Sequence, residues 1–211
     1  LPGGVDFEAG AFATLGAIAL HGFRLGEPQL GDRVAVIGLG LLGQLAMQIA
    51  RASGCVPFGI DLDHARVDLA NRLGGRAAIR ADALETGAAL SAGIGFDAVL
   101  ICAHTQDNDP LELAGQLARD RGRVVVIGAV GMQVPRKLYY DKELQLTVSR
   151  SYGPGRYDPR YEEGGVDYPI GYVRWTERRN IEAFVELLDQ GKVQVAPLIS
   201  HRFPVEQADG G

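Results

Sequence analysis

The chain has 211 residues, of which 46% are hydrophobic and 22% are charged, and its formal net charge is −5 at pH 7. This composition predicts a globular protein with a full hydrophobic core, and the scattered lysines and arginines leave no basic surface for nucleic acid or an anionic membrane. The two cysteines, Cys55 and Cys102, cannot form a CxxC zinc knuckle or a disulfide framework. We therefore expect two small core residues and a cytoplasmic protein.

The first predicted element is a buried helix, because residues 9–20 are almost entirely apolar. This stretch is too short to span a bilayer, and no basic segment precedes it as in a signal peptide. The chain begins at Leu1 and enters this helix directly. We therefore expect it to be a piece of a longer protein.

The next segment carries the glycine motif GLGLLG, which starts at Gly38, between a predicted strand at 33–37 and a helix that starts at Leu41. Gly38 permits a tight turn, and Gly40 has no Cβ to keep a pyrophosphate from the backbone. Gly43 lets the helix pack closely against the strand. The N–H groups at the start of the helix then face the phosphates. The motif predicts a dinucleotide-binding fold.

An acidic residue, Asp61, stands at the end of the following predicted strand, 56–60. Its carboxylate can accept hydrogen bonds from both hydroxyls of an adenosine ribose and would repel a 2′-phosphate, so we expect NAD(H) rather than NADP(H). The alternative is that Asp61 serves a turn or helix cap ahead of Asp63 and His64. A glycine triplet alone is weak evidence, but strand, glycines, helix, strand and acid in this order are specific.

The alternation of helices and strands continues along the chain. The predicted helices are 63–73, 83–92 and 110–118, and the predicted strands are 77–79, 96–102, 122–128 and 144–149. Such continuous apolar strands indicate an α/β fold, a Rossmann-type doubly wound parallel sheet with helices on both faces. Its ligand crevice lies at the carboxyl ends of the strands, so residues 103–105 and 128–130 are expected along the path of the cofactor.

Residues 152–179 interrupt this alternation with five of the seven tyrosines, the only tryptophan and five arginines. Either these aromatic side chains only pack a long loop onto the sheet, or the loop has a function, as long irregular loops often do. A helix at 177–190 and a strand around 198–203 are predicted after it. We expect one nucleotide-binding domain over the whole chain. Its parts are a leading helix at 1–23, the core sheet at 33–150, the long loop at 152–179, and a final helix and strand at 180–211.

Several segments resemble a known family. Residues 5–22, 30–44 and 198–208 are similar to the medium-chain dehydrogenases/reductases of the alcohol dehydrogenase type. The segments Ser149-Arg-Ser-Tyr-Gly-Pro-Gly-Arg-Tyr-Asp-Pro and Asp167-Tyr-Pro-Ile-Gly-Tyr-Val-Arg-Trp-Thr-Glu resemble, more narrowly, the bi-domain oxidoreductases, in which such a dehydrogenase is fused to a sugar-oxidoreductase-like module.

The resemblance implies transfer of a hydride between NAD(H) and an alcohol or carbonyl substrate, a small molecule related to sugars. By position, Arg66 matches a basic residue that contacts the adenosine ribose, although it could equally be an exposed helix charge. The carboxamide of nicotinamide is expected beside Ala129, Val130, Ser151 and Tyr152. The expected cofactor-binding residues are Gly38, Gly40, Leu41, Leu42, Gly43, Asp61, Arg66, Ala103, His104, Gly128, Ala129, Val130 and Ser151.

The chain departs from the family pattern in its metal ligands. The amino-terminal catalytic domain is missing, with no GHE motif or four-cysteine cluster, and Ala13 stands where a cysteine ligand would be. No pair of histidines has ligand spacing. We therefore expect no metal site and a zinc-independent enzyme. His104 and Tyr152 are candidate proton donors by location, as is a group on the missing domain.

Two other functions stay open. The chain could be a nucleotide-binding or assembly module that catalyses nothing by itself. It could also be an S-adenosylmethionine methyltransferase, which shares the glycine loop and ribose acid, although Gly43 and the family-like end argue against this.

The sixth predicted strand, 144–149, closes one edge of the sheet, and a bare apolar edge tends to pair with another chain. Family members commonly dimerise at this edge, so we expect a homodimer with two-fold symmetry. The preceding segment, residues 134–140, could extend this edge, although Pro135 lacks an N–H and could instead guard it. The loop at 152–179 could also cover the edge and leave a monomer.

Overall fold

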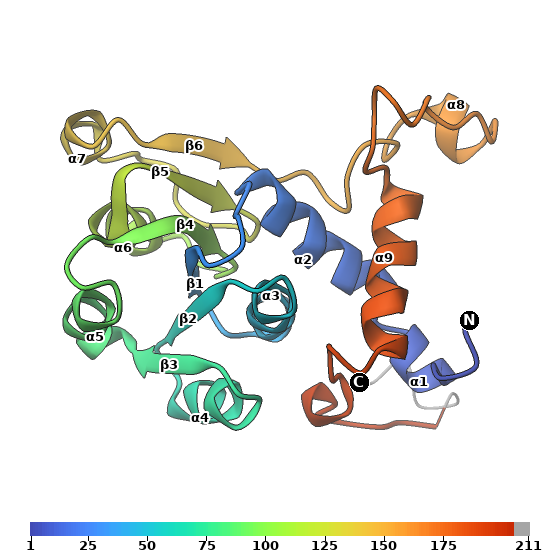
Figure 1. The fold of residues 1–211 in the computed structure, drawn as a ribbon, viewed down its shortest axis with the longest axis horizontal. Coiled ribbons are helices and arrows are strands. Elements are labelled where there is room, and N and C mark those ends of the chain that lie inside the picture. The colour runs from blue at the N-terminus through green and yellow to red at the C-terminus, as the bar shows by residue number, and fades with distance from the viewer. Residues whose placement is uncertain (205–211) are drawn as a thin grey trace.

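The computed structural model describes residues 1–204, which form a six-stranded parallel sheet flanked by helices (Figure 1). The strand order is β3-β2-β1-β4-β5-β6. Because β1 pairs with both β2 and β4, the winding direction of the chain reverses at β1, and a crevice opens there at the carboxyl ends of the strands. The Rossmann-type fold is confirmed. The strands are β1 Arg33–Ile37, β2 Val56–Asp61, β3 Arg76–Ile79, β4 Phe96–Ile101, β5 Ala118–Val126 and β6 Gln145–Val148.

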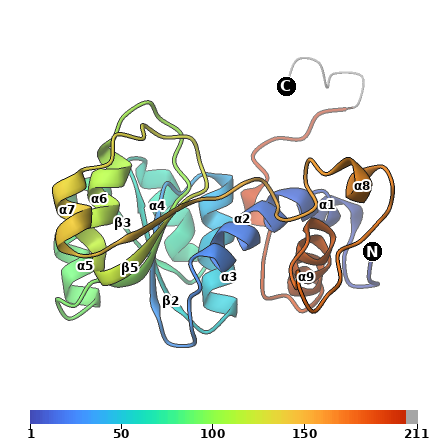
Figure 2. The same cartoon turned by 90° about the horizontal axis from the view of Figure 1, so that it is seen from above.

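The helices lie in two layers on the sheet and in an outer lobe. In Figure 2, α5, α6 and α7 lie on one side of the sheet, α2 and α3 on the other, and α8 and α9 farther out. The helices are α1 Phe7–Gly10, α2 Ala13–Leu25, α3 Leu41–Ala52, α4 His64–Arg72, α5 Ala83–Leu90, α6 Asp109–Leu117, α7 Arg136–Asp141, α8 Pro159–Glu162 and α9 Glu177–Asp189. Within residues 1–204, no helix is long and apolar enough to cross a membrane.

Both faces of the sheet are buried, which explains why its strands are continuously apolar. Side chains along a strand point alternately to opposite faces. In β1, Val34 and Val36 belong to the core under α2, α3 and α4, whereas Ala35 and Ile37 belong to the core under α5 and α6. All four side chains are buried, so a polar residue at any of these positions would lose its contact with water.

The predicted leading helix is two helices in the structure. Asp6 caps α1, since its carboxylate accepts a hydrogen bond from Ala9 N at 2.7 Å, and α1 ends after one turn at Gly10, a residue type that is unfavourable in helices. The second helix, α2, continues to Leu25 because Phe23 is still buried in the core.

The prediction of a strand around residues 198–203 is wrong. The structure has a 3₁₀ turn at Ala196–Leu198 and irregular chain as far as Pro204. In the part of the chain that is described, no strand pairs with this segment, and Pro197 has no N–H to donate to a strand. The helix start expected at residues 205–208 lies outside the described residues.

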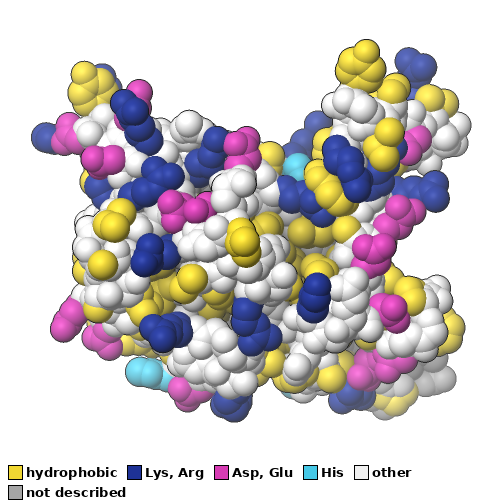
Figure 3. Space-filling view, in the orientation of Figure 1, with side chains coloured by type: hydrophobic (Ala, Val, Ile, Leu, Met, Phe, Trp, Pro, Cys, Tyr) yellow, Lys and Arg dark blue, Asp and Glu magenta, His cyan; other side chains and the backbone are white. Residues whose placement is uncertain are grey.

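The long aromatic loop packs through α2 and α9. Tyr161 stacks on Tyr168 with ring centroids 5.4 Å apart, and its hydroxyl donates to Thr176 Oγ1, the cap of α9. Trp175 lies between two guanidinium groups, those of Arg24 on α2 at 3.2 Å and of Arg174 at 3.8 Å. Such cation–π contacts stabilise the packing of the loop on α2. Lys and Arg side chains gather around this lobe in Figure 3.

The side chain of Gln48 on α3 holds the segment that follows α9. The amide of Gln48, which is 3% exposed, accepts from Gln194 N at 2.7 Å and donates to Gln194 O at 3.1 Å. A buried amide with both groups paired is held firmly, because leaving either group unpaired costs free energy. The carboxyl-terminal segment is thereby attached to the helix that follows the glycine motif.

Candidate functional site

The glycine motif forms a tight turn between β1 and α3. Gly38 has φ of +92°, which favours glycine, and its N–H donates to Ile60 O of β2 at 2.8 Å. A Cβ on Gly43 would lie 1.8 Å from Gly38 O, so only glycine lets α3 approach the turn. A Cβ on Gly40 would meet nothing within 4 Å. Open space therefore lies in front of the first turn of α3, where helix N–H groups can bind an anion.

Asp61 closes this turn from β2. Its Oδ2 accepts from Leu39 N at 2.6 Å, and its Oδ1 accepts from Asp63 N at 2.9 Å. Asp61 therefore has the role in a turn that was one alternative for it. It does not cap α4, because the cap residue of that helix is Asp63. Asp61 is 9% exposed and also lines the cleft, and Arg66 Nη1 lies 3.7 Å from its Oδ2. One carboxylate therefore shapes the turn and faces the open space.

A cleft of about 750 Å³ runs along the carboxyl ends of β1, β2, β3 and β4. Six of the residues expected at the cofactor line it, namely Gly38, Gly40, Asp61, Arg66, Ala103 and His104. Leu41, Leu42 and Gly43 belong to the first turn of α3 beside it. The residues that follow β5 and β6, namely Gly128, Ala129, Val130 and Ser151, are not part of its lining.

The ends of β4 and β5 are held together next to the cleft. His104 and Ala129 form a parallel bridge, and Thr105 N donates to Ala129 O at 2.8 Å. A Cβ on Gly128 would lie 2.0 Å from Ala103 O, so the close approach requires glycine there. This contact brings the segment after β5 to the margin of the cleft.

The far end of the cleft holds residues that no sequence motif indicated. Arg80, which follows β3, and Asp107 and Asp109, which precede α6 or begin it, all line the cleft. All strands of a parallel sheet have their carboxyl ends at the same edge. The position of Arg80 directly after a predicted strand therefore indicates that it lies at the cleft.

The two candidate proton donors lie in different surroundings. His104 lines the cleft, whereas Tyr152 follows Ser151, whose φ is +52°. The carbonyl of Tyr152 accepts from Asn180 Nδ2 at 2.9 Å, and burial raises the pKa of its phenol. A raised pKa makes this phenol a weaker proton donor. Of the two, His104 is the better placed.

His21 of α2 lies against the same segment, since a Cβ on Gly153 would be 3.3 Å from its Nδ1. Burial, followed by the nearby charge of Arg24, lowers the pKa of His21. The ring is therefore neutral at pH 7. Burial also raises the pKa of the Cys102 thiol to about 12, so it stays protonated beside the cleft.

The side chains of the described residues do not fit a zinc ion. Across residues 1–204, no three His, Cys, Asp or Glu side chains gather as a ligand set. Ala13, the position that the resemblance relates to a cysteine ligand, is the first residue of α2 and has no donor atom.

Residues 42–163 match a family model described as zinc-binding dehydrogenase. L-threonine 3-dehydrogenase of Bacillus licheniformis is 28% identical over 186 residues, which cover 86% of this chain and 47% of that protein. Sorbitol dehydrogenase of Halalkalibacterium halodurans is 27% identical over 99% of this chain and 56% of its own length. The chain thus spans about half the length of these curated relatives.

Two solved structures share the fold and contain a nicotinamide cofactor. A short chain alcohol dehydrogenase from Escherichia coli CFT073 complexed with NADH has a TM-score of 0.76 at 20% identity, covering 99% of this chain and 56% of that one. A structure from Sinorhizobium meliloti 1021 described as a zinc-binding dehydrogenase, bound to NADP, has a TM-score of 0.71 at 22% identity, covering 94% and 53%.

Proposed function

Because the chain belongs to the zinc-binding dehydrogenase family, we propose that it is the NAD(H)-binding part of an alcohol-dehydrogenase-like oxidoreductase. The observation that carries this proposal is the open space between Gly40 and the buried carboxylate of Asp61. A diphosphate fits at the first turn of α3, and a ribose fits at Asp61. Structural relatives bind NADH or NADP, so the choice of NAD(H) rests on Asp61 alone.

In this proposal the chain binds and orients the cofactor. Gly38 and Gly40 admit the phosphates, Asp61 and Arg66 bind the adenosine ribose, and the segments after β5 and β6 hold the nicotinamide end. When bound, nicotinamide supplies or accepts the hydride. His104 is a candidate to move the accompanying proton.

The substrate is proposed to be an alcohol or carbonyl compound related to sugars, in keeping with relatives such as sorbitol dehydrogenase. Since the chain spans about half of such relatives, we propose that it binds cofactor without catalysing the reaction alone. A cytoplasmic location stays a prediction based on the cysteines.

Titration calorimetry with three ligands tests the cofactor assignment. We expect NADH to bind with one site per chain and more tightly than NADPH, and S-adenosylmethionine not to bind, because the carboxylate of Asp61 disfavours a 2′-phosphate. Binding of S-adenosylmethionine in place of NADH would support the methyltransferase alternative. Binding of none of the three would contradict the proposed function.

The purified chain is expected to hold no stoichiometric zinc, because Ala13 offers no ligand atom and the described residues contain no alternative cluster. Elemental analysis after dialysis measures this. One zinc per chain that disappears on replacing Cys55 or Cys102 would contradict the prediction and identify ligands that the geometry does not indicate.

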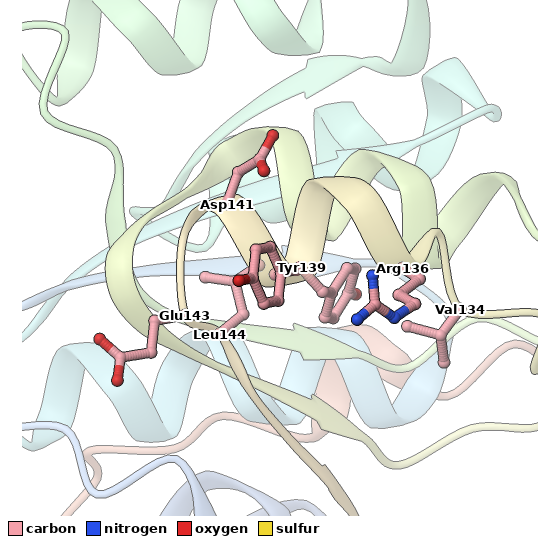
Figure 4. A pocket seen from close by; sticks show the side chains of 7 residues that line it. Val134, Arg136, Tyr139, Asp141, Glu143 and Leu144 are labelled. Carbon is pink, nitrogen blue, oxygen red and sulfur yellow. The ribbon is translucent and has the colours of Figure 1, made fainter.

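We also propose that two chains pair through β6. Within residues 1–204, the sole strand partner of β6 is β5, and Val148 at the end of β6 is 62% exposed. A hollow of about 880 Å³ lies beside this edge, with Tyr139 and Arg136 of α7 on its wall (Figure 4). The residues of the aromatic loop pack against α2 and α9, which supports a dimer over the covered-edge monomer.

Light scattering at micromolar concentration is expected to give the mass of a dimer. Val148→Lys should shift it toward the monomer, because a charged residue on an edge strand disfavours pairing. Val166→Lys, at an exposed apolar position in the loop, is the matched control and should leave the mass unchanged. A monomeric mass for both the wild type and a chain lacking the loop would contradict pairing at this edge.

A further inference from the structure

The cleft continues beyond Asp61 to an ion pair that the binding of phosphate and ribose does not use. Arg80 Nε donates to Asp109 Oδ2 at 2.8 Å, and Arg80 Nη2 donates to Asp109 Oδ1 at 2.5 Å. The pair joins the end of β3 to the first residue of α6. A bidentate pair of this kind holds the guanidinium in one plane and one position.

Arg80 retains hydrogen-bonding capacity in this position. A guanidinium has five N–H donors, and Asp109 engages two of them. Among the described residues no other acceptor contacts Arg80, and its side chain is 27% exposed, on the wall of the cleft. Donors and one edge of a planar cation are therefore available to a molecule in the cleft.

The strand order decides which part of a dinucleotide reaches Arg80. Since β2 lies between β1 and β3, Asp61 lies between the glycine turn and Arg80. With the diphosphate at Gly40 and the ribose at Asp61, the base on that ribose extends toward β3. We propose that Arg80 is the residue that contacts the adenine base of the cofactor. This inference rests on the proposed function.

The chemistry of this end of the cleft suits a purine such as adenine. Its ring nitrogens accept hydrogen bonds, and its π-face attracts a guanidinium. Its exocyclic amine donates, and Asp107, whose Oδ1 accepts from Asp109 N at 3.0 Å, lines the cleft as an acceptor. Lysine could supply the charge of Arg80 but neither the plane nor the fork of donors.

Calorimetry with ADP-ribose, which contains the adenine, ribose and diphosphate but no nicotinamide, tests this role. Arg80→Met and Arg80→Lys are both expected to weaken binding roughly five- to tenfold, the effect of one lost contact. Arg76→Met removes an exposed arginine from β3, the strand that precedes Arg80, and should bind as the wild type does. Thermal unfolding of each variant reports whether the fold is retained, and Arg80→Lys preserves a cation for Asp109.

Three outcomes overturn the proposal or its basis. Equal affinity of Arg80→Met and wild type shows that Arg80 does not contact the base. Full affinity in Arg80→Lys shows that only its charge acts, through the diphosphate. If the wild type does not bind ADP-ribose, the proposed dinucleotide site itself is wrong, so this failure is distinguishable from the other two.

Discussion

Replacing Asp61 with alanine is expected to remove the preference of the chain for NADH over NADPH. The carboxylate accepts hydrogen bonds from the ribose hydroxyls in the proposed complex, and hydrogen bonds to a charged group contribute about 1.5–3 kcal/mol. NADH binding should therefore weaken by roughly tenfold or more, while NADPH binding is relieved of repulsion. The affinities of both nucleotides are measured by calorimetry.

Asp61 also accepts from Leu39 N and Asp63 N, so alanine disturbs the turn as well as the ribose contact. Asp61→Asn keeps the shape of the side chain and one of its two acceptor oxygens without the charge, so it should lose most of the discrimination with less effect on the fold than alanine has. Asp68→Asn, which neutralises an exposed acid on α4, is the charge control. Equal affinities of the wild type for NADH and NADPH would refute the assignment of Asp61.

Gly43→Ala is expected to destabilise the fold strongly. Its Cβ would lie 1.8 Å from a backbone oxygen of the turn, which cannot move aside as a flexible side chain would. Overpacking costs about 1–3 kcal/mol and sometimes more, so we expect the upper end and a fall in Tm of roughly 10 °C. Thermal unfolding followed by circular dichroism measures the change.

Gly40→Ala is the matched variant with the opposite expectation. Its Cβ meets nothing within 4 Å, and φ at Gly40 is −64°, which alanine adopts readily. The Tm should stay within a few degrees of the wild type, whereas NADH binding should weaken at least roughly tenfold because the methyl group occupies the place of a phosphate. A normal affinity for NADH in Gly40→Ala would place the phosphates elsewhere.

The strands of the sheet could be predicted from the sequence because each of them is specified by neighbouring residues. Each strand is a continuous apolar run, and the glycine motif specifies the turn through steric demands that the structure shows at Gly38 and Gly43. The position of Asp61 beside the turn also followed, since it ends the neighbouring strand.

The remaining features depend on contacts between distant segments. The extra strand expected around residues 198–203 is rich in residues that favour strands, but no strand of the described chain pairs with this segment. The pair between Arg80 and Asp109 joins residues 29 positions apart, and no local pattern relates them. The packing of the aromatic loop on α2 depends on Arg24, which lies about 150 positions before Trp175 and carries no signal of this role.

The attachment of Gln194 to Gln48 has a consequence for how related chains can vary in length. The carboxyl-terminal segment is held by α3, which precedes the aromatic loop in the sequence. The helix α9 is held by α2, where Phe184 fills the space beside Gly16. Neither attachment passes through residues 155–172. A recombinant chain with a shortened loop should therefore keep both of these attachments, although it loses the hydrogen bond from Tyr161 to the cap of α9.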